Sequence, residues 1–128
     1  MSNDHLNRKI LIVDDNQDLV RALQLLLKNY ALILAESGKQ AVEMAFTLEP
    51  DLILMDIIMP EMDGLEATRM IRQNPKTRSM PILAITAGVS NSIEDECSQA
   101  GCDDFISKPF TIEELGSRIE KLLKQDSV

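Results

Sequence analysis

Five polar residues in this chain carry groups that could act together on a phosphate: Asp14, Asp15, Asp56, Thr86 and Lys108. Clustered carboxylates repel one another, and a hard cation such as Mg²⁺, which prefers oxygen ligands, relieves that repulsion. A lysine ammonium and a threonine hydroxyl suit the oxygens of a phosphoryl group. Asp56 could then attack phosphorus and form an aspartyl phosphate. These residue types therefore indicate magnesium-assisted phosphoryl transfer, provided that the fold brings them together.

Taken singly, each of these residues has an ordinary structural explanation. Asp14 and Asp15 could be acids that precede a helix, and Asp56 could be a turn acid. Thr86 could be a plain strand residue and Lys108 a surface lysine. What favours a common role is their placement, because each follows or closes a short apolar run.

The apolar runs predict a parallel sheet. They do not alternate with polar residues, which is typical of strands that are covered on both faces. The stretches between them are long enough for crossover helices. The expected strands are 9–13, 31–35, 52–55, 81–85 and 104–107.

Helix signals fill the intervening segments. Pairs of capping residues predict that helices begin near 38, 64 and 112, where Ser37, Asp63 and Thr111 precede them. A first helix after Asn16 shows apolar residues on one face, namely Leu19, Val20, Leu23, Leu26, Leu27 and Tyr30. The last helix is expected to bury Ile112, Leu115, Ile119, Leu122 and Leu123.

The segment 90–100 offers little to a core. Its apolar side chains are Ile93, Cys97 and Ala100, so we expect this fourth helix to be the least firmly held. Five strand-helix units with right-handed crossovers make a doubly wound α/β sandwich. Ligands in such sheets bind at the carboxyl ends of the strands, where the five polar residues stand.

Size and composition limit the possible functions. A chain of 128 residues suits one domain, and its apolar runs are too short to cross a bilayer. Its start shows no signal peptide, so we expect a cytoplasmic location and no membrane insertion. The net charge of −8 disfavours direct nucleic-acid binding. Cys97 and Cys102 lack a zinc-type pattern and are expected to be buried thiols without a role.

The ordered motifs resemble those of one family. They are the DD pair at 14–15, MDIIMPEMDG at 55–64, the Thr-Ala pair at 86–87 and KPF at 108–110. Together they resemble the receiver domains of two-component response regulators, of the single-domain chemotaxis type, over residues 8–125. The resemblance implies a flavodoxin-like fold with strand order 2-1-3-4-5, preceded by a polar lead-in at 1–7 and followed by a tail at 126–128.

The resemblance also implies roles for individual residues. Asp56 would accept a phosphoryl group from a histidine kinase or a histidine phosphotransfer protein. Asp14 and Asp15, with Asp56 and the backbone carbonyl of Ile58, would hold Mg²⁺. Thr86, the backbone N–H of Ala87 and Lys108 would bind the phosphoryl oxygens, and the Lys108–Pro109 bond would be cis.

Phe105 stands where the family has a switch Tyr or Phe. Thr86 and Phe105 would move together on phosphorylation and alter the surface of the fourth helix, fifth strand and fifth helix, which would then control a partner protein. An aromatic residue that merely packs on an edge strand remains an equal alternative for Phe105. Ile58 and Gly88 offer no polar group to orient an attacking water, which predicts a long-lived phosphorylated form.

Three other functions compete with this one. A haloacid-dehalogenase-type phosphatase needs an acid two positions after the nucleophile, where Ile58 stands. A flavodoxin-like flavin binder needs a phosphate loop where this chain has DDNQD. A phosphorylation-independent interaction module stays open. We expect no enzyme activity beyond the chain's own phosphorylation and dephosphorylation. The cognate kinase, the downstream target, the oligomeric state and membership of a longer protein are not specified by the sequence.

Overall fold

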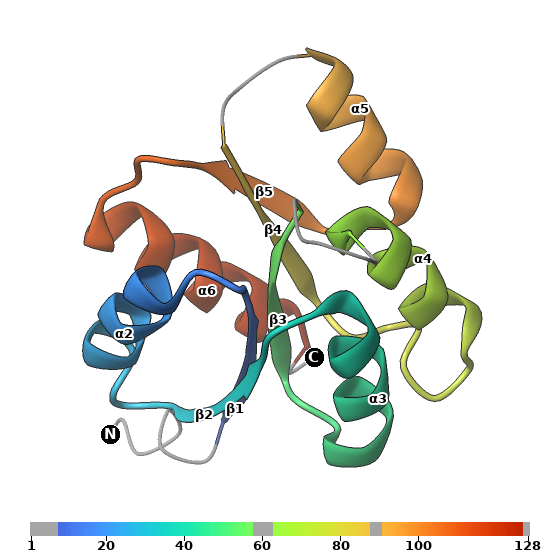
Figure 1. Ribbon diagram of the computed structural model, residues 1–128, viewed down its shortest axis with the longest axis horizontal. Helices are drawn as coiled ribbons and strands as arrows, with labels where there is room; N and C mark the ends of the chain where they lie inside the picture. The colour runs from blue at the N-terminus through green and yellow to red at the C-terminus, as the bar shows by residue number, and fades with distance from the viewer. Residues whose placement is uncertain (1–7, 58–62, 88–90, 127–128) are drawn as a thin grey trace.

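A five-stranded parallel sheet runs through the middle of the molecule in the order β2-β1-β3-β4-β5 (Figure 1). The structure, a computed structural model, describes residues 8–57, 63–87 and 91–126. Its strands are β1 (Lys9–Val13), β2 (Ala31–Ala35), β3 (Leu52–Asp56), β4 (Ile82–Thr86) and β5 (Asp104–Ser107). The expected fold class and strand order are therefore confirmed.

Helices cover both faces of this sheet (Figure 1). They are α2 (Gln17–Leu26), α3 (Gly38–Leu48), α4 (Gly64–Gln73), α5 (Asn91–Ala100) and α6 (Ile112–Asp126). α2 and α6 pack on one face, whereas α3, α4 and α5 pack on the other. Among the described residues, no helix combines the length and the apolar character that a membrane span requires.

Alternate residues of each central strand enter opposite sides of the core. On β1, Ile10 and Ile12 pack with α2 and α6, whereas Leu11 and Val13 pack with α3 and α4. All four are essentially inaccessible to solvent. This is why the strands read as continuous apolar runs, since a strand covered on both sides has no polar face.

The helices begin where the capping residues predicted. The side chains of Ser37, Asp63 and Thr111 accept hydrogen bonds from the backbone N–H three residues later, at 3.1, 2.8 and 3.0 Å. Asn16 caps α2 in the same way. These bonds satisfy N–H groups that have no partner within their helix, and so they define each helix start.

Some local expectations were wrong. Ile112 is 60% exposed although it was expected in the core, and Leu26, expected on the apolar face of the first helix, is 38% exposed. Ile112 is the first residue of α6, whereas Leu26 lies at the margin of the buried face of α2, since Leu23 and Leu27 are both buried. β3 includes Asp56, and β4 is displaced by one residue from the expected run because it begins after Pro81.

Candidate functional site

The carboxyl edge of the sheet brings the predicted acids onto neighbouring strands. Val13 pairs with Met55 in the parallel register, so one residue further lie Asp14, directly after β1, and Asp56, the last residue of β3. The backbone N–H of Asp14 also bonds the carbonyl of Ala35 at 3.1 Å, which fixes its backbone beside β2. Segments 42 positions apart in sequence thus meet at one point.

Three carboxylates converge there. Asp14, Asp15 and Asp56 each offer one oxygen, and these oxygens lie within 4.8 Å of one another. Asp14 is 1% exposed and Asp56 is 8% exposed, whereas Asp15 faces solvent. The structure therefore brings together all three acids that the sequence proposed as metal ligands.

One oxygen of this cluster has no hydrogen-bond partner. Oδ1 of Asp14 accepts a bond from the backbone N–H of Asn16 at 2.8 Å, but its buried Oδ2 accepts none. A buried carboxylate oxygen without a donor is unfavourable, and a second buried carboxylate nearby adds repulsion. A hard divalent cation held by Asp14, Asp15 and Asp56 would relieve both, so the residues present fit Mg²⁺.

The amino end of α4 packs against the backbone at the end of β3. The backbone N–H of Gly64 bonds the carbonyl of Ile57 at 2.8 Å. A Cβ at position 64 would lie 2.1 Å from the backbone oxygen of Asp56, so only glycine allows this approach. Sequence reasoning found the cap at Asp63 but missed Gly64, although a glycine directly after a capping residue is a readable signal of close packing.

The fourth and fifth strands supply the hydroxyl and the lysine. Thr86 ends β4 and is 4% exposed, and its hydroxyl donates to the carbonyl of Ile106 at 3.5 Å. The backbone N–H of Lys108 donates to the carbonyl of Thr86 at 2.8 Å, which holds Lys108 beside the end of β4. Ala87 is exposed directly after Thr86. The Lys108–Pro109 bond is cis, as the resemblance implied.

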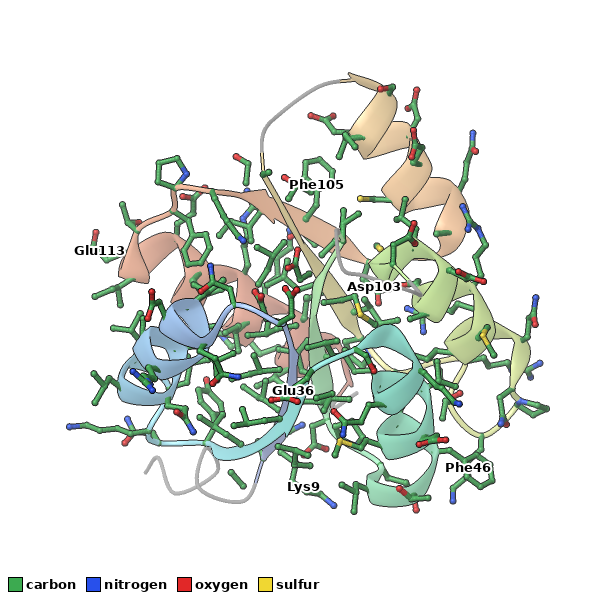
Figure 2. All side chains as sticks on the ribbon, in the orientation of Figure 1. Lys9, Glu36, Phe46, Asp103, Phe105 and Glu113 are labelled. Atoms are coloured by element: carbon green, nitrogen blue, oxygen red, sulfur yellow. The ribbon has the colours of Figure 1, made fainter. Side chains whose placement is uncertain are left out.

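Phe105 lies half-buried on β5 (Figure 2). It packs against the group of buried residues that includes Cys97 and Ala100 of α5. This position links the ring to the helix that carries few other apolar contacts. Its role as a switch residue stays a prediction, and so do the individual roles of Thr86, Ala87 and Lys108.

Two expectations concern residues outside the described part. The backbone carbonyl of Ile58 was proposed as a metal ligand, and Ile58 and Gly88 were proposed to prolong the phosphorylated state. Both positions lie outside the described residues.

The two cysteines are free thiols. Cys97 is buried, and Cys102 is partly buried with its Sγ 4.0 Å from the hydroxyl of Thr68. Burial raises the pKa of the Cys97 thiol and raises the pKa of Cys102 to about 12. Both thiols therefore stay protonated at neutral pH, as befits packing residues.

A family model described as the response regulator receiver domain matches residues 10–120. The chain belongs to this family. The match favours a receiver over the phosphatase and flavin-binding alternatives.

Individual relatives agree with the family match. The response regulator ArlR of Staphylococcus saprophyticus is 43% identical over 119 residues, which is 91% of this chain and 53% of that protein. The polar-differentiation response regulator DivK of Brucella ovis is 35% identical over 109 residues, which is 84% of this chain and 89% of DivK. The chain spans about half the length of the first curated relatives that it matches.

One similar solved structure contains a metal ion. The receiver domain of a sensor histidine kinase from Pseudomonas aeruginosa superimposes with a TM-score of 0.86 at 35% identity, over 92% of this chain and 98% of that one. That structure is described with a magnesium ion coordinated in its active site cleft. The present chain is thus a receiver domain of two-component systems.

Proposed function

We propose that this receiver is a phosphorylation-dependent signalling switch whose acceptor is Asp56. The observation that carries the proposal is the buried pair of Asp14 and Asp56, in which one oxygen of Asp14 has no partner. That oxygen of Asp14 is not satisfied by the protein itself. Its burial becomes favourable when a cation binds beside it.

The reaction begins with attack of a carboxylate oxygen of Asp56 on the phosphorus of a phosphohistidine. A bond forms between that oxygen and phosphorus, the bond between phosphorus and the imidazole nitrogen breaks, and the imidazole keeps the electron pair. The donor is a histidine kinase or a histidine phosphotransfer protein. No external substrate is turned over, so catalysis is limited to the chain's own phosphorylation and dephosphorylation.

The other site residues would bind the metal ion and the phosphoryl oxygens and neutralise their charge. Asp14, Asp15 and Asp56 would bind Mg²⁺, which supplies positive charge against the phosphoryl oxygens. Lys108 follows β5 directly and would add a second positive charge. The hydroxyl of Thr86 and the backbone N–H of Ala87 would donate to the remaining oxygens.

The output of the switch would run through Thr86. Its hydroxyl now donates to the carbonyl of Ile106 on β5, and the 3.5 Å distance marks a weak bond. If the hydroxyl turns toward a phosphoryl group, β5 loses that contact, and Phe105 on the same strand can repack against α5. The surface formed by α5, β5 and α6 would then change and control a partner protein.

The test is phosphorylation by a small donor. The protein is incubated with acetyl phosphate and Mg²⁺, and intact mass is measured. We expect one phosphoryl increment in the wild type and in Asp95→Asn, a matched change of an exposed acid on α5, but none in Asp56→Asn or after chelation with EDTA. An increment that persists in Asp56→Asn would refute the assignment of the acceptor.

The same experiment separates the second candidate. A phosphorylation-independent interaction module would show no increment with any donor, although its fold and its acidic cluster are intact. The fit of the three carboxylates to a cation favours the phosphorylated switch over this module.

A further inference from the structure

The helix α5 is buried unevenly along its length. Its fully buried side chains are Cys97 and Ala100, at 1% and 3% exposure, and both belong to its second half. In the first half, Ile93 packs against the same buried cluster but is only half-buried, as is Glu94, and Asp95 is exposed. The apolar contacts that hold α5 to the protein are therefore concentrated toward its carboxyl end.

The carboxyl end of α5 also has a complete backbone cap. The N–H of Cys102 bonds the carbonyl of Cys97 at 2.9 Å, and the N–H of Gly101 bonds the carbonyl of Ser98 at 3.1 Å. With Gly101 at φ +110°, these are the two bonds of a Schellman motif. The cap satisfies the last carbonyls of the helix and fixes the direction in which the chain leaves it.

A single arginine from α4 holds this cap. Nε of Arg72 donates to the carbonyl of Gly101 at 2.8 Å, and one terminal nitrogen donates to the carboxylate of Asp103 at 2.8 Å. The other donates to the carbonyls of Arg78 and Met80, both at 2.7 Å. A Cβ at Gly101 would lie 2.7 Å from Cγ of Arg72, so the glycine also makes room for the arginine stem.

Asp103 extends the connection to the sheet. Its Oδ2 also accepts the backbone N–H of Ile82 at 2.8 Å, and its own N–H donates to the carbonyl of Ile82 at 2.9 Å. Arg72 and Asp103 thus tie the end of α4, the start of β4 and the end of α5 into one group, which we call the Arg72 anchor. Charged hydrogen bonds of this kind are stronger than neutral ones.

We propose that the Arg72 anchor makes the carboxyl end of α5 a fixed pivot, and that α5 opens and tilts from its amino end. The amino end follows the segment that begins at Thr86 and Ala87, at the carboxyl edge of the sheet. The carboxyl end lies at the start of β4, which is the opposite edge. A displacement at the site edge would therefore turn the helix about the anchor instead of shifting it as a whole.

The pivot itself does not require phosphorylation. Only the idea that this pivot transmits the phosphorylation of Asp56 rests on the proposed function. The two ideas can therefore fail separately, and the pivot is tested in protein without Mg²⁺ or a phosphoryl donor.

The test is amide hydrogen exchange, followed residue by residue by NMR. Asp95 and Glu96 carry the first N–H groups of α5 whose helical partners lie within the helix. In the wild type, we expect Gly101, Cys102 and Asp103 to exchange at least about tenfold more slowly than Asp95 and Glu96, because local opening follows weak burial.

The variant Arg72→Lys keeps the charge but cannot span the four acceptors. It should accelerate exchange at Gly101, Cys102 and Asp103 by roughly tenfold or more, the size expected for losing a charged hydrogen bond. Exchange at Asp95 and Glu96 should stay within about twofold, since local opening there does not involve the anchor. Arg69→Lys, on the exposed side of the same helix, should leave all of these rates unchanged.

Amides of β1 and β3 report global unfolding and separate it from the local effect. If Arg72→Lys accelerates these strands and all of α5 by one common factor, Arg72 acts on overall stability and the pivot is wrong. Equal protection along α5 in the wild type, or unchanged exchange at residues 101–103 in the variant, would also overturn it.

Discussion

Replacing Asp14 by Asn should stabilise the protein in the absence of divalent cations while removing most of its response to Mg²⁺. Asp14 and Asp56 are both buried, and their oxygens lie within 4.8 Å. At that separation and an effective dielectric of about 20, two full charges repel by about 3.5 kcal/mol. The open edge of the sheet lets water screen part of this, so we expect a net gain of about 2 kcal/mol.

The substitution is also sterically conservative. Oδ1 of Asn can keep the bond that Asp14 accepts from the N–H of Asn16. The amide nitrogen would occupy the position of Oδ2, which has no partner, and could donate to a neighbouring carboxylate. No cavity and no new clash are introduced, so the change in charge dominates the outcome.

Thermal unfolding in EDTA and in Mg²⁺ is the assay. A gain of about 2 kcal/mol corresponds to a rise in Tm of about 6–10 °C for a domain of this size. When Mg²⁺ exceeds its Kd tenfold, the wild type should gain about 1.4 kcal/mol, whereas Asp14→Asn should gain far less. The difference in Tm between the two proteins should therefore narrow as Mg²⁺ is added.

Glu43→Gln is the control, because it makes the same change in net charge on the exposed side of α3. It should alter neither the Tm in EDTA nor the response to Mg²⁺. The reasoning is refuted if Asp14→Asn lowers the Tm in EDTA, or if its Tm rises with Mg²⁺ as much as that of the wild type.

Two further outcomes can be measured directly. Gly64→Ala should lower the free energy of unfolding, measured in urea, by about 2–3 kcal/mol, because the new Cβ meets the backbone of Asp56. Gly116→Ala should raise the free energy of unfolding by about 0.5–1 kcal/mol, because nothing lies within 4 Å of its new Cβ. Similar effects at both sites would contradict this. Cys102, whose pKa is raised to about 12, should react with iodoacetamide at pH 8 roughly a thousandfold more slowly than a thiol whose pKa is 9.0. The reason is that only the thiolate reacts, and its fraction falls by about that factor. Because burial raises this pKa, unfolding in urea should abolish the protection, and equal rates in folded and unfolded protein would count against burial as the cause.

Much of the fold could be predicted because its signals are local. Each central strand is an apolar run covered on both faces, and each cap joins residues three apart, so Ser37, Asp63 and Thr111 marked true helix starts. The error at Ile112 fell at a helix start. Ile112 belongs to the right helical face but is the first residue of α6 and is 60% exposed, and periodicity does not show where burial along a helix begins.

The Arg72 anchor could not be predicted from such signals. Its acceptors lie on residues 78, 80, 101 and 103, and three of its bonds go to backbone carbonyls, which every residue possesses. In the sequence, Arg72 reads as one more basic residue near the end of a helix. Only Gly101, a glycine directly after α5, hinted at a close approach there.

The sequence alone encoded which side chains reach the carboxyl edge of the sheet, because residue order and the direction of parallel strands place Asp14, Asp56 and Thr86 at strand ends. The tertiary structure decided which of the acids at this edge are buried and which face solvent. Of two adjacent acids, Asp14 is buried beside Asp56 and Asp15 faces solvent. That choice depends on the register of β1 against β3, two strands whose partners lie 42 residues apart, and no local pattern carries this information.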